Sequence, residues 1–402
     1  MIEKTLSAIC RNQTPVNHHF KNGLLVESLR KDESITIVPI VDDAGDPVGL
    51  VDKQTALNLA SNPLHYAAYQ NRSVRMLMSE KFMSLDINTP IDVAAAELLN
   101  NGFSLSKGGF LITQDGHYVG VGACTDTLSY LVELNTARAI EMAELNEEVM
   151  DSVRYASRIQ MGLLPTREKL EKSLRGVDVI WEPRDIVGGD VYWRSEDTGQ
   201  NFFTIGLIDC TGHGVPGALM SMIVLSILNR IYSEDPNVQP GAALAKLGNL
   251  VRAALNQNTE KANSNDGFDA GLCKIDLDSR KMQFAGARNN CFAVPLTDEP
   301  ILRLAGEKLA LGYPGTQPYE ALEEYEIEFD KFRTFCLASD GVFDQPGGPS
   351  RIAFGPKRFM DFLNKNRHEK ASFLMSGLKK THDEWRGTEL RRDDLSALCF
   401  SI

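Results

Sequence analysis

The first third of the chain contains a duplicated segment, and this repeat limits how that part can fold. The stretches PIVDDAGDPVGLVDKQTAL and FLITQDGHYVGVGACTDTL align so that Gly45 matches Gly116 and Gly49 matches Gly120. Each copy is predicted to form a strand, a tight turn, a second strand and then a helix. Because duplicated units bury their apolar faces against each other, we expect one pseudo-symmetric module.

These two segments resemble the paired motifs of cystathionine-β-synthase (CBS) modules, over about residues 15 to 132. CBS pairs often bind adenine nucleotides through a Thr or Ser and an Asp at the start of the closing helix. The resemblance therefore implies an adenine nucleotide at Thr125 and Asp126 of the second copy. The first copy arranges Asp52, Lys53 and Thr55 differently. A module that serves only for dimerisation is the alternative interpretation.

The size and charge of the chain restrict its organisation and its partners. Because 402 residues exceed one ordinary core, we expect two domains. The formal charge of -12 disfavours nucleic acid and anionic membranes as partners. No apolar run approaches the ~18 residues of a membrane span, and the N-terminus does not resemble a signal peptide. Seven widely spaced cysteines without a C-x-x-C pair are interpreted as reduced thiols, so the expected location is the cytoplasm.

An apolar seam predicts one long helix from about residue 127 to residue 164. Its members recur every three or four positions among Glu and Arg residues: Met142, Leu145, Val149, Ser152, Ala156, Ile159 and Leu163. This pattern is typical of a coiled coil, so a homodimer is expected, with Ser152 and Ala156 making the seam adjustable. A helix that lies on one of the domains is the alternative. Pro165 ends the helix.

Four acidic sites follow, each next to a predicted strand. Asp209 ends the apolar stretch before TGHGVPG, and Asp190 follows two glycines in DIVGGDVYW. Asp340 ends FCLASD, and Asp393 and Asp394 precede the last strand. A single Asp beside glycines is also typical of a turn or a helix cap. Four carboxylate sites at strand termini, however, are the donor set that Mg²⁺ or Mn²⁺ requires.

Five stretches together resemble the motifs of the PPM (protein phosphatase 2C-like) family, in particular its bacterial SpoIIE and RsbU branch. They are VGGDVYW, DCTGHGVPGALMS, FAGARNN, LASDGVFD and RRDDLSALCFSI, and the resemblance covers about residues 159 to 402. The implied fold is α+β. It consists of a CBS-pair-like α/β module over residues 1–132, a helical linker over 133–164, and a phosphatase domain over 165–402. That domain is an αββα sandwich of two antiparallel sheets flanked by helices.

The resemblance also implies roles for the carboxylates as catalytic residues and metal ligands. Asp209 corresponds to the ligand that bridges two Mn²⁺ or Mg²⁺ ions, and the backbone carbonyl of Cys210 completes one site. Asp340 and Asp393 correspond to ligands of the second metal. Asp190 corresponds to the carboxylate that holds metal-bound waters.

Five further residues near these motifs receive weaker assignments. Asp394 ranks below Asp393 as a metal ligand, and Asp344 corresponds to a ligand of a third metal. His213 is interpreted as a structural histidine bonded to backbone rather than as a general acid. Arg184 and Arg288 could reach a phosphate, although surface ion pairs are their default interpretation.

The resemblance implies a metal-dependent protein serine/threonine phosphatase. A water molecule activated by two metals attacks phosphoserine or phosphothreonine in line, so no nucleophilic Ser or Cys is required. The expected substrate is a phosphorylated anti-sigma-antagonist (STAS-type) protein, and the N-terminal module is expected to control the reaction. The alternative is a nucleotide-sensing CBS adaptor whose phosphatase-like domain is an inactive scaffold.

Overall fold

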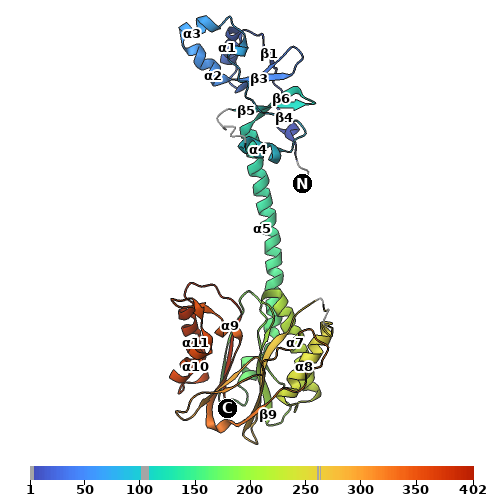
Figure 1. Cartoon of the computed structure of the whole chain (residues 1–402), viewed down its shortest axis with the longest axis vertical. Coiled ribbons are helices and arrows are strands. Elements are labelled where there is room, and N and C mark those ends of the chain that lie inside the picture. Colours follow the sequence, from blue (N-terminus) through green and yellow to red (C-terminus); the bar gives the residue numbers. More distant parts are fainter. Residues whose placement is uncertain (1–3, 101–107, 260–261, 263) are drawn as a thin grey trace. The chain divides into compact units, whose positions relative to one another are not determined.

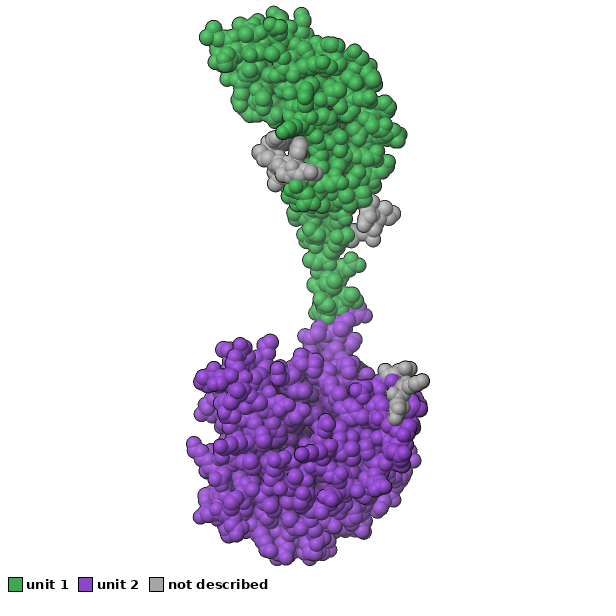
Figure 2. All heavy atoms as spheres, in the orientation of Figure 1, with its two compact units in different colours: residues 1–147 green, residues 148–402 purple. Residues whose placement is uncertain are grey.

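The computed structural model describes residues 4–100, 108–259, 262 and 264–402. The chain folds into two compact units, residues 1–147 and residues 148–402, which Figure 2 colours separately. The boundary falls inside one helix, α5 (Cys124–Leu163). The predicted domain limits at residues 132 and 164 therefore stay predictions.

The N-terminal unit repeats one arrangement of strands and helices (Figure 1). Each copy has a three-stranded sheet, ordered β1-β2-β3 or β4-β5-β6, with a parallel first pair and an antiparallel second pair. The first copy comprises β1 (Val16–Asn17), α1 (Asn22–Lys31), β2 (Ile37–Val41), β3 (Pro47–Asp52), α2 (Lys53–Ser61) and α3 (Pro63–Tyr69). The second comprises β4 (Ser84–Asp86), α4 (Ile91–Asn100), β5 (Gly109–Gln114), β6 (His117–Ala123) and the start of α5. Short 3₁₀ turns are η1 (Leu6–Ala8) and η2 (Val74–Met76).

The two copies face each other through apolar side chains. Ile37 of β2 packs with Leu111 of β5 and Val121 of β6, and each copy also has its own apolar core. Both tight turns contain a glycine with φ of 90°, Gly45 and Gly116, in a conformation that favours glycine. The repeat thus forms the pseudo-symmetric, CBS-pair-like module that the sequence predicts.

Helix α5 confirms the predicted long helix and has 40 residues. Most apolar members of its seam are exposed: Met142, Leu145 and Val149 keep 59%, 56% and 54% of their surface, respectively. Ile159 and Leu163 are also exposed. In the single chain these side chains therefore lack the cover that a helix lying on a domain would have.

The C-terminal unit consists of two five-stranded antiparallel sheets, ordered β14-β11-β10-β9-β8 and β13-β12-β15-β18-β7. The strands of the first sheet are β8 (Val191–Arg194), β9 (Phe202–Cys210), β10 (Phe268–Asp276), β11 (Lys281–Ala287) and β14 (Tyr325–Glu328). Those of the second are β7 (Gly176–Glu182), β12 (Cys291–Pro295), β13 (Leu302–Leu304), β15 (Phe332–Ala338) and β18 (Leu395–Ser401). The helices are α6 (Arg167–Glu171), α7 (Gly214–Glu234), α8 (Pro240–Ala254), α9 (Asp340–Phe343), α10 (Gly355–Lys365) and α11 (Ala371–Arg386). A small ribbon pairs β16 (Pro346–Gly347) with β17 (Ile352–Ala353), and η4 (Phe329–Lys331) precedes β15.

Three apolar clusters hold the layers of this unit together. Leu207 of β9 and Leu398 of β18 belong to the cluster between the sheets. The next residue of β9, Ile208, points to the other face and packs with α7 and α8. Helices α10 and α11 cover the opposite sheet, for example through Leu374. Figure 1 shows the two helix pairs on the two flanks of the sheets, which confirms the predicted αββα sandwich.

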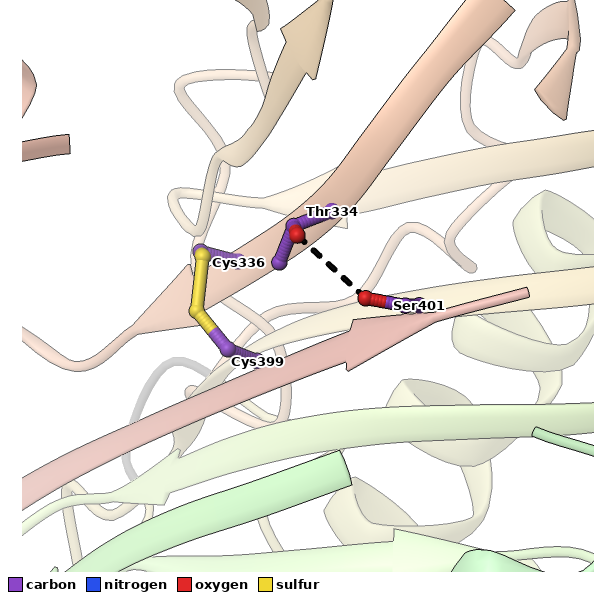
Figure 3. Close-up of a disulfide and its surroundings, with 4 residues drawn as sticks. All are labelled: Thr334, Cys336, Cys399 and Ser401. Atoms are coloured by element: carbon purple, nitrogen blue, oxygen red, sulfur yellow. Dashed lines mark hydrogen bonds between the residues drawn. A yellow bond between two sulfur atoms is a disulfide. The ribbon is translucent and has the colours of Figure 1, made fainter. Parts of the chain in front are cut away.

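The expectation that all cysteines are free thiols is wrong. Cys336 on β15 and Cys399 on β18 form a disulfide, with Cα atoms 4.2 Å apart (Figure 3). The two residues lie opposite each other in the antiparallel register, and the nearby hydroxyls of Thr334 and Ser401 are 3.3 Å apart. A separation of 63 positions hides this pair in the sequence, because only the strand pairing brings the cysteines together.

The expectation that no segment is as long and apolar as a membrane span is also wrong. Helix α7 has 21 residues and contains an 18-residue window with a mean hydropathy of 1.5, enough by length and composition to cross a membrane. Its buried face, which includes Val224, Leu228 and Ile231, belongs to the apolar cluster on β9 and β10. Its composition therefore suits a core helix of this unit, which passes the same test.

Candidate metal centre

Strand pairing brings carboxylates from distant parts of the sequence to one end of the sandwich. Strand β15 ends two residues before Asp340, and β18 begins directly after Asp394. Because β15 and β18 are antiparallel neighbours, the end of one and the start of the other share an edge. Asp209 of β9 reaches the same place, since its Oδ2 accepts a hydrogen bond of 3.4 Å from the backbone N–H of Asp340.

The assembled carboxylates disfavour their own charged forms. Asp190, which directly precedes β8, is 2% exposed, and burial together with the charge of Asp394 raises its pKa to about 8. Burial and the charges of Asp190 and Asp340 raise the pKa of Asp209 well above its ordinary range. Asp340 keeps contact with solvent, but desolvation and the charges of Asp393 and its neighbours raise its pKa to about 6. This crowding is the electrostatic environment that divalent cations relieve.

Asp394 holds the backbone of the loop that carries Asp190. Its Oδ1 accepts a hydrogen bond from the N–H of Arg184 at 2.6 Å, and its Oδ2 accepts from Gly189 at 2.6 Å and Asp190 at 3.3 Å. The carboxylate of Asp393 accepts only the N–H of Asp394, at 2.9 Å, among the described residues. Asp394 therefore acts on the backbone, while Asp393 retains acceptor capacity for a cation.

The same loop lies tightly against the end of β9. A Cβ atom at Gly189 would lie 2.5 Å from the carbonyl oxygen of Cys210 and 2.7 Å from that of Gly212. Only glycine permits this approach. The Cys210 thiol is buried, and burial raises its pKa well above the ordinary value.

Asp344 and His213 lie near the cluster in different roles. Asp344 follows the short helix α9, and its N–H donates to the carbonyl of Asp340 at 2.8 Å. His213 Nδ1 lies 2.9 Å from Asp185 Oδ2, and both side chains are exposed. The predicted backbone partner of His213 is therefore wrong, since its ring nitrogen pairs with a carboxylate.

Sequence reasoning missed Asp269, which lies in the cluster. Asp269 on β10 is the register partner of Asp209 on β9. Burial raises its pKa to about 6, and the nearby Arg288 opposes this shift. The only signal was an acidic residue inside the apolar strand GFDAGL. Of the two arginines that could reach a phosphate, Arg288 lies near the charge of Asp269, whereas the guanidinium of Arg184 donates to the carbonyl of Arg392 at 3.1 Å.

Comparison with known proteins agrees with this arrangement. The family model for stage II sporulation protein E (SpoIIE) matches residues 199–402, just over half of the chain. The chain belongs to the SpoIIE family. This family comprises PP2C-type serine phosphatases. No curated protein matches the chain in sequence.

Solved structures are similar to parts of this SpoIIE-family chain. The SiaA-PP2C domain of Pseudomonas aeruginosa is 32% identical, with a TM-score of 0.57 over 65% of this chain and 99% of that chain. The phosphatase domain and a regulatory fragment of SpoIIE from Bacillus subtilis are 15% identical, with a TM-score of 0.42 over 56% and 63% of the two chains. CBSX2 in complex with AMP is 20% identical, with a TM-score of 0.27 over 33% and 98%.

A second residue that sequence reasoning missed connects helix α5 with the metal loop. Gln160, in the last turn of α5, is fully buried. Its Nε2 donates to the carbonyl of Gly188 at 2.6 Å and to Ser221 Oγ on α7 at 3.0 Å, and its Oε1 accepts the N–H of Gly188 at 3.3 Å. The end of the long helix is therefore bonded two residues from Asp190.

The predicted nucleotide residues of the SpoIIE-family chain lie beside a cavity in the N-terminal unit. This cavity has a volume of about 430 Å³ and is lined by residues of both copies, including Arg11, Ile37 and Gly122. Arg11 also binds both carboxylate oxygens of Asp126, at 2.9 and 2.8 Å. Thr125 and Asp126 are not among the residues that line the cavity.

Proposed function

We propose that this SpoIIE-family chain is a metal-dependent protein serine/threonine phosphatase. The observation that carries the proposal is the convergence of Asp190, Asp209, Asp340 and Asp393 at one end of the sandwich. Because these groups repel one another, they need added positive charge, and divalent cations with oxygen ligands supply it. The donor set thus fits two Mg²⁺ or Mn²⁺ ions.

Each residue has a definite part in this proposal. The metals would be held by Asp209, Asp340, Asp393 and the backbone carbonyl of Cys210. Bound there, two divalent cations would supply the Lewis acidity that activates water for in-line attack on phosphoserine or phosphothreonine. Asp190 would orient water, and Asp394 would hold its loop in place. The Cys210 thiol has no part, because its raised pKa keeps it protonated.

The proposed substrate is a phosphorylated STAS-type regulatory protein in the cytoplasm. Membership of the SpoIIE family supports this choice, and the partly exposed Asp340 supports access by a protein-bound phosphate. The N-terminal unit would control the reaction. The cavity lined by residues of both copies supports an adenine nucleotide as the ligand of that unit. The exposed apolar side chains of the α5 seam support a homodimer.

Phosphate release from phosphorylated STAS-type proteins, with and without Mn²⁺, tests the proposal. Asp209→Asn should reduce turnover by more than about 100-fold, because changing even the groups that orient metal ligands costs 10–100-fold. Asp178→Asn, on β7 and outside the cluster, serves as the matched carboxylate control.

Two outcomes would contradict the assignment. Full activity in folded Asp209→Asn would exclude the metal centre described here. A folded but inactive Cys210→Ala enzyme would indicate thiol chemistry, because that substitution keeps the backbone carbonyl. Absence of metal-dependent hydrolysis in the wild type, also with p-nitrophenyl phosphate, would favour the inactive adaptor.

A further inference from the structure

A separate cluster of metal-ligating side chains lies in the N-terminal unit, at the turn after β1. The Nε2 atoms of His18 and His19 are 2.8 Å apart, and Nε2 of His19 lies 3.9 Å from Oδ2 of Asp43. Asp43 belongs to the turn between β2 and β3. One ligand atom from each residue lies within 4.8 Å of the other two.

The second copy of the repeat shows which residues this turn needs for folding alone. The N–H of His18 donates to the carbonyl of Val41 at 2.9 Å, as the N–H of Ile87 donates to Thr113 at 2.8 Å. The two positions are therefore equivalent, and Asn88 corresponds to His19. The same turn forms in the second copy with isoleucine and asparagine, so folding does not require the two imidazoles.

Burial makes the histidine of the first copy costly. His18 is only 5% exposed, and its Nδ1 has no hydrogen-bond partner among the residues that the structure describes. A buried polar atom without a partner lowers stability, whereas the isoleucine of the second copy carries no such atom. Nε2 of His18 faces His19, so Nε2 is the ligand atom that this position offers to a cation shared with His19 and Asp43.

Asn17 holds the backbone of His19 and the side chain of Asp43. Its Oδ1 accepts the backbone N–H of His19 at 2.9 Å, and its Nδ2 donates to Oδ1 of Asp43 at 2.9 Å. This leaves Oδ2 of Asp43 on the side of His19. Such support of ligands by neighbouring hydrogen bonds is typical of metal sites.

We propose that His18, His19 and Asp43 bind a transition-metal ion of the Zn²⁺ type. Two imidazoles and one carboxylate are ligands that Zn²⁺ accepts, with water in the remaining position. Tetrahedral coordination needs about 3.3 Å between the two Nε2 atoms, so the ring of His19 has to move by a few tenths of an ångström. That side chain is 69% exposed and free to do so. Binding ties the turn after β1 to the turn between β2 and β3.

Titration of the full-length protein without a histidine tag tests this site. Excess Mg²⁺ keeps the all-oxygen centre of the C-terminal unit occupied, and Co²⁺ serves as a spectroscopic probe for the nitrogen ligands. We expect the wild type to bind one more Co²⁺ per chain than His19→Asn, with a visible absorption band that Zn²⁺ abolishes. His19→Asn copies Asn88 of the second copy, so it preserves the turn.

His117→Ala is the matched control. His117 is an exposed histidine of the same unit that also pairs with a carboxylate, Asp46, at 2.7 Å, but it lies outside the cluster. The His117→Ala variant should bind the same number of Co²⁺ ions per chain as the wild type. His18→Ile, which copies Ile87, should fold and lose the rise in melting temperature that Zn²⁺ produces. Equal Co²⁺ binding by the wild type and His19→Asn, or no binding by either, would overturn the proposal.

Discussion

The carboxylates of the metal centre repel one another when they are ionised. Asp190 is buried, and its Oδ2 has no hydrogen-bond partner among the described residues. Its pKa is raised to about 8, and that of Asp269 to about 6, mainly by burial. An acid with a higher pKa in the folded state binds protons more tightly there than in the unfolded chain. The metal-free fold is therefore favoured by protonation of this end of the sandwich.

This repulsion predicts how the stability of the metal-free protein depends on pH. The contribution of these carboxylates to the stability of the metal-free protein should fall as pH rises from about 4, where unfolded Asp ionises, towards about 8, where folded Asp190 loses its proton. Asp190→Asn should stabilise the metal-free protein at pH 8 by on the order of 1–3 kcal/mol, since one pKa unit corresponds to about 1.4 kcal/mol.

Thermal unfolding in EDTA between pH 5 and pH 8.5 provides the measurement. Saturating Mg²⁺ or Mn²⁺ should remove most of the loss of stability at high pH, because the cations neutralise the ionised carboxylates. A metal-free protein whose stability rises over this range would contradict the electrostatic description of the site.

At the scale of elements, the end of α5 and the metal loop form one bonded structure. The side chain of Gln160 satisfies both backbone groups of Gly188 and also binds Ser221 of α7. Three elements therefore meet at one buried amide. A displacement of the helix end would have to break these bonds or carry the loop of Asp190 with it.

Gln160→Leu tests this coupling. Because the substitution leaves the buried N–H and C=O of Gly188 without partners, it should destabilise the C-terminal unit by about 1–3 kcal/mol. It should also raise the Mn²⁺ concentration needed for half-maximal activity, since the loop next to Asp190 loses its support. The adjacent Met161→Ala, at a position 56% exposed, is the control. If both variants show the same Mn²⁺ dependence as the wild type, Gln160 does not position the loop.

Periodic features of elements could be predicted from the sequence, but pairings between them could not. The spacing of apolar residues predicts α5, and the repeat predicts two matching sheets. Asp209 and Asp340 stand out because each ends an apolar strand. Asp269 and Gln160 carry no such signal, since an Asp within a strand and a Gln within a helix are ordinary until their neighbours are known. The Cys336–Cys399 disulfide is hidden for the same reason.

At the scale of the whole molecule, the exposed seam of α5 is the surface that most needs a partner. Leu145 and Val149 are both more than half exposed. Helices with an apolar stripe of this kind are typically stabilised by packing against another helix. A second copy of the chain can supply that stripe in matching register.

Leu145→Lys with Val149→Lys should convert a dimer into a monomer or abolish regulated activity, because it places like charges in the seam. Sedimentation and turnover of the same preparation check this expectation. Glu144→Lys with Glu147→Lys adds positive charge to the helix on the side away from the seam and should leave the mass unchanged. If the seam variant matches the wild type in both mass and activity, α5 serves only as a tether.

The pairing of β15 with β18 has a consequence for how the segment between them can vary in length. Ala338 and Ala397 are paired in register, and the disulfide joins the same two strands four residues before Asp340 and six residues after Asp393. The segment between these two strands, which includes α10 and α11, therefore begins and ends at positions that the strand pairing fixes. Insertions or deletions can change the length of this segment over evolution without separating Asp340 from Asp393, because the paired strands hold both residues in place.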